Sequence, residues 1–581
     1  MPADGARGHA AGQQQAPATA TAATRREAVR DATSLLAVLL LYNLPLAYAQ
    51  NDVTLIWRPA PETLVLFYLL AAARNWRQAS ERLTGLLVVA VSVLGGLLWI
   101  LRIVDAAIVS IYDRTLILYL DLGYAGDLIA FLDQTAFIGL GWLAMAGVLA
   151  ALAGLLVAGW RLARRFARVP HTQVGARALL LASAVLLLAG AVVALGRGQE
   201  PHALGPSSLP RLWGELAELG RGADRAERQE QQLSAAATSV ANVTRPMDLL
   251  DADLFLFIVE SYGHTVLANP THFSLVDPTY QRMEASLTAA GYQIHSHFLD
   301  SPAYGGNSWL ADATLTTGVW IADQEIYDRL LLSRVPTLAT MLSAVGFRTV
   351  NAQPANVTPW PEGDYFGFDA KYYYHDYGFR GPVLGWPPMT DQFAIDQIHR
   401  REVAAAVDPL FVQYVLISSH YPFRVIPRYI PDWDSLGDGS LYHRDDALVR
   451  ISRQRDNETG GSLGFATAIN YTLEVIEGYL LGYVAERDAL VVIVGDHQPW
   501  SGISGRGQPR SVPIHVLSKR EDLLQPFVAR GYTPGLVPRQ PLPHPGMETF
   551  MRGLVEDFST TATGGWATID EPIFGVTELL P

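Results

Sequence analysis

Residues 254–263 read Leu-Phe-Leu-Phe-Ile-Val-Glu-Ser-Tyr-Gly, a run of apolar residues that ends at a glutamate. The run has no polar alternation, which is typical of a strand buried on both faces of a parallel sheet. Similar runs occur at 411–417 and 490–494, with weaker ones at 346–350 and 512–517. Segments of helical composition lie between them, at 276–290, 310–318, 335–344 and 465–485. This alternation predicts an α/β domain with helices on both faces of a layered sheet.

Two of these runs end in residues that can bind a cation. The first is followed by Glu260, and the run 490–494 is followed by Gly495, Asp496 and His497. Either fragment alone has a simpler structural interpretation, as a helix cap or a buried hydrogen bond. In such sheets, however, the ligand site lies beyond the carboxyl ends of the strands. Two acids and an imidazole that converge there form an oxygen and nitrogen set suited to Mn²⁺, Mg²⁺ or Zn²⁺.

A third fragment, residues 304–310, reads Tyr-Gly-Gly-Asn-Ser-Trp-Leu and predicts a tight turn with a helix starting at Ser308. A serine at this position is most simply an N-cap. A helix N-terminus also stabilises anions, and a hydroxyl that touches a divalent cation becomes an activated nucleophile. Taken with Glu260 and the Asp496–His497 pair, this position favours a nucleophilic role for Ser308.

Two histidines remain open to more than one interpretation. His420 follows the run 411–417 and is either a structural histidine or a donor to a phosphoryl oxygen or leaving group. His515, in the run 512–517, is either a residue of the strand core or an additional contact of the metal site.

The first third of the chain has the composition of a membrane protein. Of 581 residues, 50% are hydrophobic and 17% are charged, against about 25% charged in soluble domains. Apolar segments at 32–50, 60–73, 84–101, 136–160 and 178–196 predict about five transmembrane helices. Arginines gather before the first, after the second and after the fourth. Because short cytoplasmic loops are enriched in basic residues, this places the N-terminus in the cytoplasm and everything after residue 196 outside.

The predicted domain order follows from these segments. A disordered cytoplasmic tail covers 1–31, a membrane domain 32–196, a stalk 197–250, a catalytic domain 251–525 and a C-terminal extension 526–581. An alternative makes the first span a signal peptide cleaved at Ala47-Tyr48-Ala49, which would leave four spans and the same external domain.

Composition excludes several classes of protein. The net charge of −13 argues against a nucleic-acid binder, which needs a basic face. The absence of cysteine excludes disulfides, thiolate zinc sites, iron–sulfur clusters and a cysteine nucleophile.

The four fragments, in this order, resemble the alkaline phosphatase superfamily. Within it they are most similar to the membrane-anchored, sulfatase-like branch that includes lipoteichoic acid synthase and the phosphoglycerol and phosphoethanolamine transferases. The resemblance covers about 251–525 by motif and the rest by topology. It implies an alkaline-phosphatase-like α/β/α sandwich outside the cell (inner) membrane, on the periplasmic side, with a divalent metal, Mn²⁺ before Zn²⁺ or Mg²⁺. The implied site residues are the metal ligands Glu260, Ser308, Asp496 and His497, with Ser308 as nucleophile, and His420, Trp360 and Asn307 at the substrate.

Two departures limit what the resemblance implies. Residues 306–309 read Gly-Asn-Ser-Trp where lipoteichoic acid synthases have a Gly-Lys-Thr-Ser pattern. Trp360 is followed by Pro361 and Glu362, where those enzymes carry an arginine that contacts phosphate. The polymerase activity and its glycerol-phosphate substrate are therefore not carried over. Sulfatase activity is disfavoured too, because 301–304, Ser-Pro-Ala-Tyr, does not fit the C/S-x-P-x-R motif that is converted to formylglycine.

The sequence thus predicts a membrane-bound, metal-dependent enzyme that moves or cleaves a phospho-head group, of phosphoglycerol or phosphoethanolamine type. The substrate would be a membrane phospholipid or an envelope glycan, attacked by Ser308 to give a covalent phospho-enzyme. One alternative is a hydrolase of another phosphate or sulfate ester. Another is a non-catalytic docking or sensing relative, for which a broken metal set would be expected.

Overall fold

The computed structural model describes residues 81–121, 208–358, 360–384 and 388–560, apart from 242 and 244, and scattered positions between 42 and 161. The chain forms two compact units. One contains Met1–Ala107 and Ala136–Ala217, and the other contains Ile108–Thr135 and Glu218–Pro581. The second unit carries all the strand-end motifs found in the sequence, together with a short segment that follows the predicted span 84–101.

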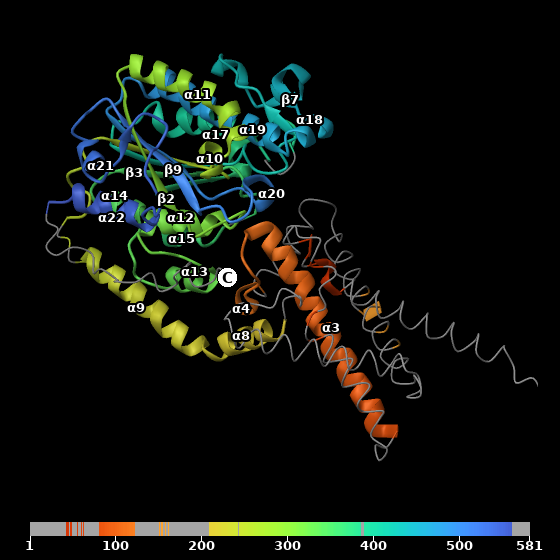
Figure 1. Cartoon of the computed structure of the whole chain (residues 1–581). Helices are drawn as coiled ribbons and strands as arrows, with labels where there is room; N and C mark the ends of the chain where they lie inside the picture. Colours follow the sequence, from red (N-terminus) through yellow and green to blue (C-terminus); the bar gives the residue numbers. More distant parts are fainter. Residues whose placement is uncertain are drawn as a thin grey trace, which may run out of the picture. The chain divides into compact units, whose positions relative to one another are not determined.

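An eight-stranded mixed sheet forms the centre of the second unit (Figure 1), in the order β10-β2-β9-β8-β1-β5-β3-β4. Its strands are β1 (Asp253–Val259), β2 (Gln293–Asp300), β3 (Arg348–Gln353), β4 (Ala370–Tyr373), β5 (Leu410–Leu416), β8 (Ala489–Gly495), β9 (Ser511–Ser518) and β10 (Thr533–Pro534). A separate two-stranded sheet pairs β6 (Val425–Pro427) with β7 (Leu448–Arg450). The stretch from β8 to β4 is parallel, as predicted. The prediction that the run 512–517 is a parallel strand is wrong, because β9 is antiparallel to both β8 and β2.

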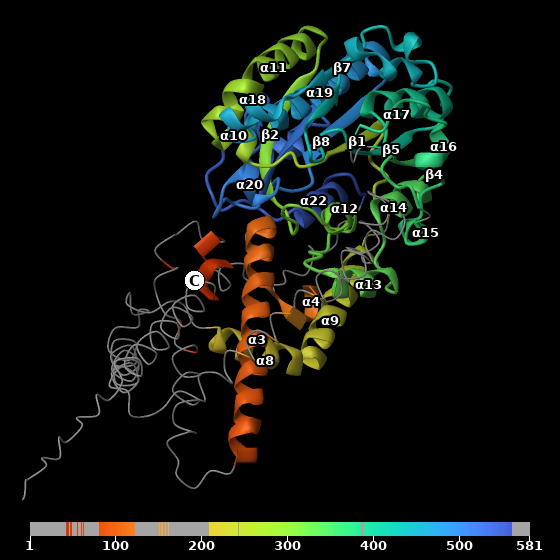
Figure 2. The same ribbon diagram turned by 90° about the vertical axis from the view of Figure 1, so that its right-hand side faces the viewer.

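Helices cover both faces of the sheet (Figures 1 and 2), as the α/β pattern predicted. The residues of β1 alternate between two cores. Phe255, Phe257 and Val259 pack with α11 (Pro270–Ala289), α17 (Asp391–Ile398) and α19 (Ser462–Tyr479). Leu254, Leu256 and Ile258 pack with α12 (Ser308–Thr317), α14 (Leu338–Ala344) and α22 (Glu548–Asp557). A strand with both faces buried explains why the sequence there has no polar alternation.

Shorter or peripheral helices complete the described part of the chain. They are α4 (Leu118–Asp121), α8 (Leu209–Gly220), α9 (Gly222–Ala241), α10 (Thr265–Ala268), α13 (Gln324–Leu331), α15 (Gly363–Phe366), α16 (Tyr374–Tyr377), α18 (Arg453–Glu458), α20 (Ser501–Ser504) and α21 (Gln525–Ala529).

Residues on both sides of the predicted boundary at 526 share this fold. β10 pairs with the sheet edge at β2, and Met551 and Leu554 of α22 lie in the same core as β1. The predicted boundary therefore crosses the sheet.

Among the described residues, one helix is long and apolar enough to cross a membrane: α3 (Glu81–Tyr112), over Gly85–Tyr112, with a mean hydropathy of 2.4. It contains the predicted span 84–101 and runs on to Tyr112, because the residues after 101 stay mostly apolar. The predicted spans 32–50, 60–73, 136–160 and 178–196 and the tail 1–31 lie wholly or largely outside the described residues. The five-helix membrane domain stays a prediction.

An acid in one of these apolar segments has a partner. Glu62 is buried, and its Oε1 lies 3.1 Å from Nη2 of Arg102 on α3. The hydroxyl of Tyr42 and the backbone N–H of Ser208 donate to the same oxygen, at 3.0 and 2.8 Å. Pairing of this kind is what makes a buried charge tolerable in an apolar environment.

Candidate active site

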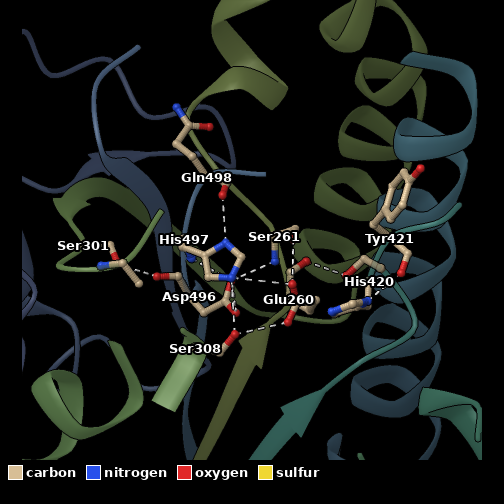
Figure 3. Close-up of polar contacts among 11 residues, drawn as sticks. Glu260, Ser261, Ser301, Ser308, His420, Tyr421, Asp496, His497 and Gln498 are labelled. Carbon is tan, nitrogen blue, oxygen red and sulfur yellow. Dashed lines mark hydrogen bonds and ion pairs between the residues drawn. The ribbon is translucent and has the colours of Figure 1, made fainter. Parts of the chain in front are cut away.

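The sheet register brings the sequence motifs together. β1 and β8 pair in parallel with Val259 opposite Gly495, so the next residues, Glu260 and Asp496, leave the same edge side by side. On its other side β1 pairs with β5, and Val259 lies opposite Leu416. The segment after β5, which carries His420, therefore reaches the same edge, as Figure 3 shows.

Ser308 reaches this edge as the first residue of α12. Gly305, Gly306 and Asn307 before it all have positive φ, of 67°, 142° and 64°, so the chain turns sharply into the helix. The N-cap is Asn307, whose side chain makes no capping hydrogen bond. The Oγ of Ser308 instead lies 3.3 Å from Oε2 of Glu260 and 3.3 Å from Nε2 of His497 (Figure 3). A positive φ at a residue other than glycine stores strain, and such strain gathers at functional sites.

The remaining ligand atoms face the same point. The Nδ1 of His497 donates to the backbone carbonyl of Gln498 at 2.8 Å, which leaves the Nε2 lone pair free to face the carboxylates. That Nε2 lies 3.6 Å from Oε1 of Glu260 and 3.5 Å from Oδ2 of Asp496. The other carboxylate oxygen of Asp496 accepts from the backbone N–H of Ser261 at 2.7 Å, so Oδ2 is the oxygen that faces the ligand group.

These distances fit a divalent cation. Ligand atoms about 2.0–2.1 Å from a tetrahedral ion lie about 3.3–3.4 Å from one another, and the four separations here are 3.3, 3.3, 3.5 and 3.6 Å. Glu260, Asp496 and His497 are all buried, and among the described residues they form the group whose ligand atoms could hold a metal. Two carboxylates this close in a buried site repel each other unless a positive charge lies between them. The donor set is therefore suited to a metal ion.

The charges in the site are strongly coupled. Burial and the charge of Glu260 raise the pKa of Asp496 above its ordinary value. Burial also opposes ionisation of Glu260, but the neighbouring His497 and His420 outweigh it and lower the pKa of Glu260. Burial opposes protonation of His497, yet the two carboxylates raise its pKa. A cation held by the donor set would relieve the repulsion between the two carboxylates.

Hydrogen bonds from three further residues fix the ligand-bearing segments. The hydroxyl of Ser301 donates to the backbone carbonyl of Asp496 at 2.5 Å, and that of Ser419 donates to the carbonyl of Glu260 at 2.6 Å. The N–H of Gly305 donates to the carbonyl of Gln498 at 2.9 Å. Sequence analysis did not identify Ser301 or Ser419 as part of the site, because a serine next to a strand end has no distinctive signal.

His420 lies beside Glu260 (Figure 3), half-buried. Its Nδ1 donates to the backbone carbonyl of Tyr421 at 2.6 Å. Burial lowers the pKa of His420, which favours the neutral ring with the lone pair on Nε2. In that form Nε2 accepts a proton, and it becomes the predicted donor only after it has taken one up.

The other predicted residues differ in their surroundings. Asn307, next to Ser308, lines a small pocket together with Tyr304 and Arg510. Trp360 stacks on Phe366, with ring centroids 5.3 Å apart, and packs against the core below the sheet. The described contacts of Trp360 do not include the metal-ligand group.

His515 lies in the strand core. It is buried, and its Nδ1 and Nε2 lie 2.6 Å from the hydroxyl of Ser296 and 2.9 Å from that of Tyr262. Both ring nitrogens are therefore engaged away from the ligand group.

Asp312 was missed by the sequence analysis. It lies one turn after Ser308 on α12, and burial and the charges of Asp496 and Glu260 raise its pKa well above the ordinary value. The i, i+4 spacing from Ser308 could have indicated that the two side chains share a helix face.

No family model and no curated protein matches the sequence. Among solved structures, the integral membrane lipooligosaccharide phosphoethanolamine transferase A of Neisseria meningitidis is 12% identical over 91% of this chain and 96% of its own, with a TM-score of 0.44. The lipoteichoic acid synthase LtaP of Listeria monocytogenes is 15% identical over 55% of this chain and 75% of its own, with a TM-score of 0.33. The phosphoglycerol transferase GacH of Streptococcus pyogenes is 12% identical over 58% and 91%, with a TM-score of 0.35. A lipoteichoic acid synthase, a phosphoglycerol transferase and a phosphoethanolamine transferase are the kinds of enzyme that the sequence motifs resemble. Because the TM-scores lie below 0.5, the function is inferred from this chain's own residues.

Proposed function

We propose that this protein is a membrane-bound, metal-dependent phosphotransferase or phosphodiesterase of the alkaline phosphatase superfamily, with Ser308 as its nucleophile. The observation that carries the proposal is that Ser308 Oγ lies 3.3 Å from both Glu260 and His497 at one edge of the sheet, while His497 lies 3.6 Å from Glu260 and 3.5 Å from Asp496. A serine used only to cap the helix would direct its hydroxyl to backbone N–H groups instead.

Glu260, Asp496, His497 and Ser308 would hold the metal. When bound, the metal would stabilise the Ser308 alkoxide and the charge on a phosphoryl oxygen. The resemblance favours Mn²⁺, and the tetrahedral spacing also suits Zn²⁺.

The chemistry would proceed in two displacements at phosphorus. In the first, a bond forms between Ser308 Oγ and phosphorus, the bond to the leaving alcohol breaks, and the proton of Ser308 ends on that alcohol. In the second, water or an acceptor hydroxyl displaces Ser308, which regains a proton. In this proposal the neutral His420, whose Nδ1 donates to the carbonyl of Tyr421, accepts the proton of that incoming hydroxyl at Nε2.

The predicted membrane segments motivate a lipid substrate, because they would hold the site near phospholipid head groups. The resemblance favours phosphoglycerol or phosphoethanolamine as the group moved.

The test is to trap the covalent intermediate. The full chain in detergent, with Mn²⁺, is incubated with phosphatidylethanolamine or phosphatidylglycerol, and the peptide that contains Ser308 is analysed by mass spectrometry. A head-group phosphate adduct on Ser308, absent from Ser308→Ala, is the expected result. Turnover without any adduct under rapid quench would instead indicate direct attack by water, and no reaction with either lipid would contradict the lipid substrate.

A further inference from the structure

A small pocket beside the nucleophile is lined by two guanidinium groups. It belongs entirely to the second unit, and its residues come from three segments far apart in the sequence. They are Tyr112, Arg114, Leu120, Pro302, Ala303, Tyr304, Asn307, Leu310, Ala322 and Arg510. No carboxylate is among these lining residues of the described chain. Asn307 is the peptide neighbour of Ser308, so a group in the pocket lies next to the reacting atoms.

The guanidinium of Arg510 contacts a backbone carbonyl and an aromatic ring. Its Nη1 donates to the backbone carbonyl of Pro302 at 3.2 Å, and its guanidinium lies 5.6 Å from the centre of the Tyr304 ring. Within the described residues it makes no ion pair with a carboxylate. Burial and the neighbouring charge of Arg114 lower the pKa of Arg510, so the site favours an anion that would offset both effects.

Arg114 is held in place from the opposite wall. Its Nη1 and Nη2 donate to the two carboxylate oxygens of Asp121 at 3.0 and 2.6 Å, and Nη1 also donates to the carbonyl of Thr115 at 3.1 Å. Asp121 in turn accepts the N–H of Ile117 at 2.8 Å. A guanidinium fixed in this way is pre-oriented, and planar guanidinium groups match the oxygens of phosphate.

The segment that carries Arg114 contacts the turn before Ser308 and the segment 501–507. The hydroxyl of Ser501 donates to the carbonyl of Ser110 at 2.5 Å, and the N–H of Gly507 donates to Oδ2 of Asp113 at 2.5 Å. A Cβ on Gly305 would lie 2.6 Å from the carbonyl oxygen of Ile111, so glycine is needed for this close approach. Residues 108–121 thus form a wall of the site.

We infer that Arg114 and Arg510 bind a second anionic group of the substrate, of phosphate type, while Ser308 attacks the first. That the anion belongs to a substrate rests on the proposed function. The binding of the anion itself does not depend on whether the protein catalyses a reaction. The enzyme would then select substrates that carry a second phosphate close to the phosphodiester.

The first experiment measures binding without turnover. The Glu260→Ala chain in detergent, with EDTA, is titrated with inorganic phosphate by calorimetry. Adding Arg510→Gln, a neutral side chain of similar length, should weaken binding by about 10- to 100-fold, as expected for loss of a charged hydrogen-bond donor. Arg114→Gln should weaken it as well, and Arg510→Lys should weaken it less, because it keeps the charge.

The matched control is Arg506→Ala, which removes an exposed arginine of the same loop that does not line the pocket. It should leave phosphate binding unchanged. Equal phosphate affinity with and without Arg510→Gln, in chains that melt at the same temperature, would overturn the inference. If phosphate binds through Arg510 but no phosphodiester is ever turned over, the proposed function fails and the anion site stands.

The same titration identifies the source of the anion. It is repeated in micelles that contain phosphatidic acid, and separately with soluble glycerol phosphate present. Competition by the lipid identifies a lipid phosphate and competition by the soluble compound identifies a soluble phosphate ester, and either supports the inference. Competition by neither contradicts it.

Discussion

Ser308 has two possible roles that a single substitution separates. If Ser308, which is the first residue of α12 and not its N-cap, has only a structural role, its replacement by alanine should leave the chemistry almost intact. As a nucleophile, Ser308→Ala should keep its melting temperature while turnover of a phospholipid falls by several orders of magnitude. Ser308→Thr keeps the hydroxyl and should restore part of the activity. Wild-type turnover in Ser308→Ala would exclude the covalent mechanism.

The metal ligands give a second prediction at the same scale. Glu260→Ala removes one of the ligand atoms spaced 3.3–3.6 Å apart, so metal content and turnover should fall together, by at least about 10- to 100-fold. Asp312→Asn is the matched control, because Asp312 is a buried carboxyl on the neighbouring helix outside the ligand group. It should keep its metal. The metal content of the two purified variants tests this prediction. Full metal occupancy in Glu260→Ala would mean that the Glu260 carboxylate is structural.

Site residues could be predicted from the sequence where they follow neighbouring parallel strands. Glu260 and Asp496 could be identified because each lies within two residues of the end of an apolar run, and parallel neighbours end at the same edge. Arg114 and Arg510 could not, because no local pattern shows that residues almost 400 positions apart meet in one pocket. The direction of the Ser308 side chain could not be predicted from the sequence either, because the N-cap lies one residue earlier than the sequence suggests.

Among the elements, β2 is a strand of the sheet that the sequence pattern did not predict. It reads Gln-Ile-His-Ser-His-Phe-Leu-Asp, too polar for a buried strand, yet Ser296 and His297 are buried in it. The hydroxyl of Ser296 donates to the carbonyl of Gly535 and accepts from His515 on β9. The polar groups satisfy one another across the strand pair, so hydrophobicity alone underestimates this element.

This pairing predicts a dependence of stability on pH. Burial lowers the pKa of His515 to about 3 in the folded protein, whereas an unfolded histidine titrates near 6.5. Below pH 6.5 the unfolded state binds a proton that the folded state excludes, so stability is lost as pH falls from 6.5 towards 3. By pH 5 the loss from this group is about 2 kcal/mol. His515→Asn should be less stable at pH 7 but show a shallower fall in melting temperature between pH 7 and 5, and an unchanged slope would contradict the assignment.

The end of β8 supports a further prediction. A Cβ on Gly495 would lie 1.9 Å from the carbonyl oxygen of Tyr262, so alanine there must push apart the two strand ends that carry Asp496 and Glu260. Gly495→Ala should cost about 1–3 kcal/mol, as overpacking does, and should lower metal affinity. Gly482→Ala, with nothing within 4 Å of its added Cβ, serves as the control and should change neither melting temperature nor metal binding. A Gly495→Ala chain with wild-type metal affinity would show that the strand ends are less constrained than these contacts require.

At the scale of the whole molecule, the predicted topology determines which side of the membrane carries the site. Because arginines mark alternate predicted loops, we expect the segment between the predicted spans 84–101 and 136–160, and everything after 196, to lie outside the cytoplasm. The hydrogen bonds from Ser501 to Ser110 and from Gly507 to Asp113 require residues 108–121 and the domain after 218 to lie on the same side. A reporter fused after residue 200 should therefore be active only outside the cytoplasm. Cytoplasmic activity of that fusion would overturn the five-span topology.

The wall formed by residues 108–121 has a consequence for how such proteins can be recombined. A chimera that joins this globular domain to the membrane helices of a relative would replace Arg114 and remove the backbone partners of Ser501 and Gly507, although every residue of the globular domain is kept. Substrate choice would then change without any change in the domain that carries Ser308. We therefore expect the segment 108–121 and the domain after 218 to be kept together when such proteins recombine. Their separation in the sequence hides this dependence.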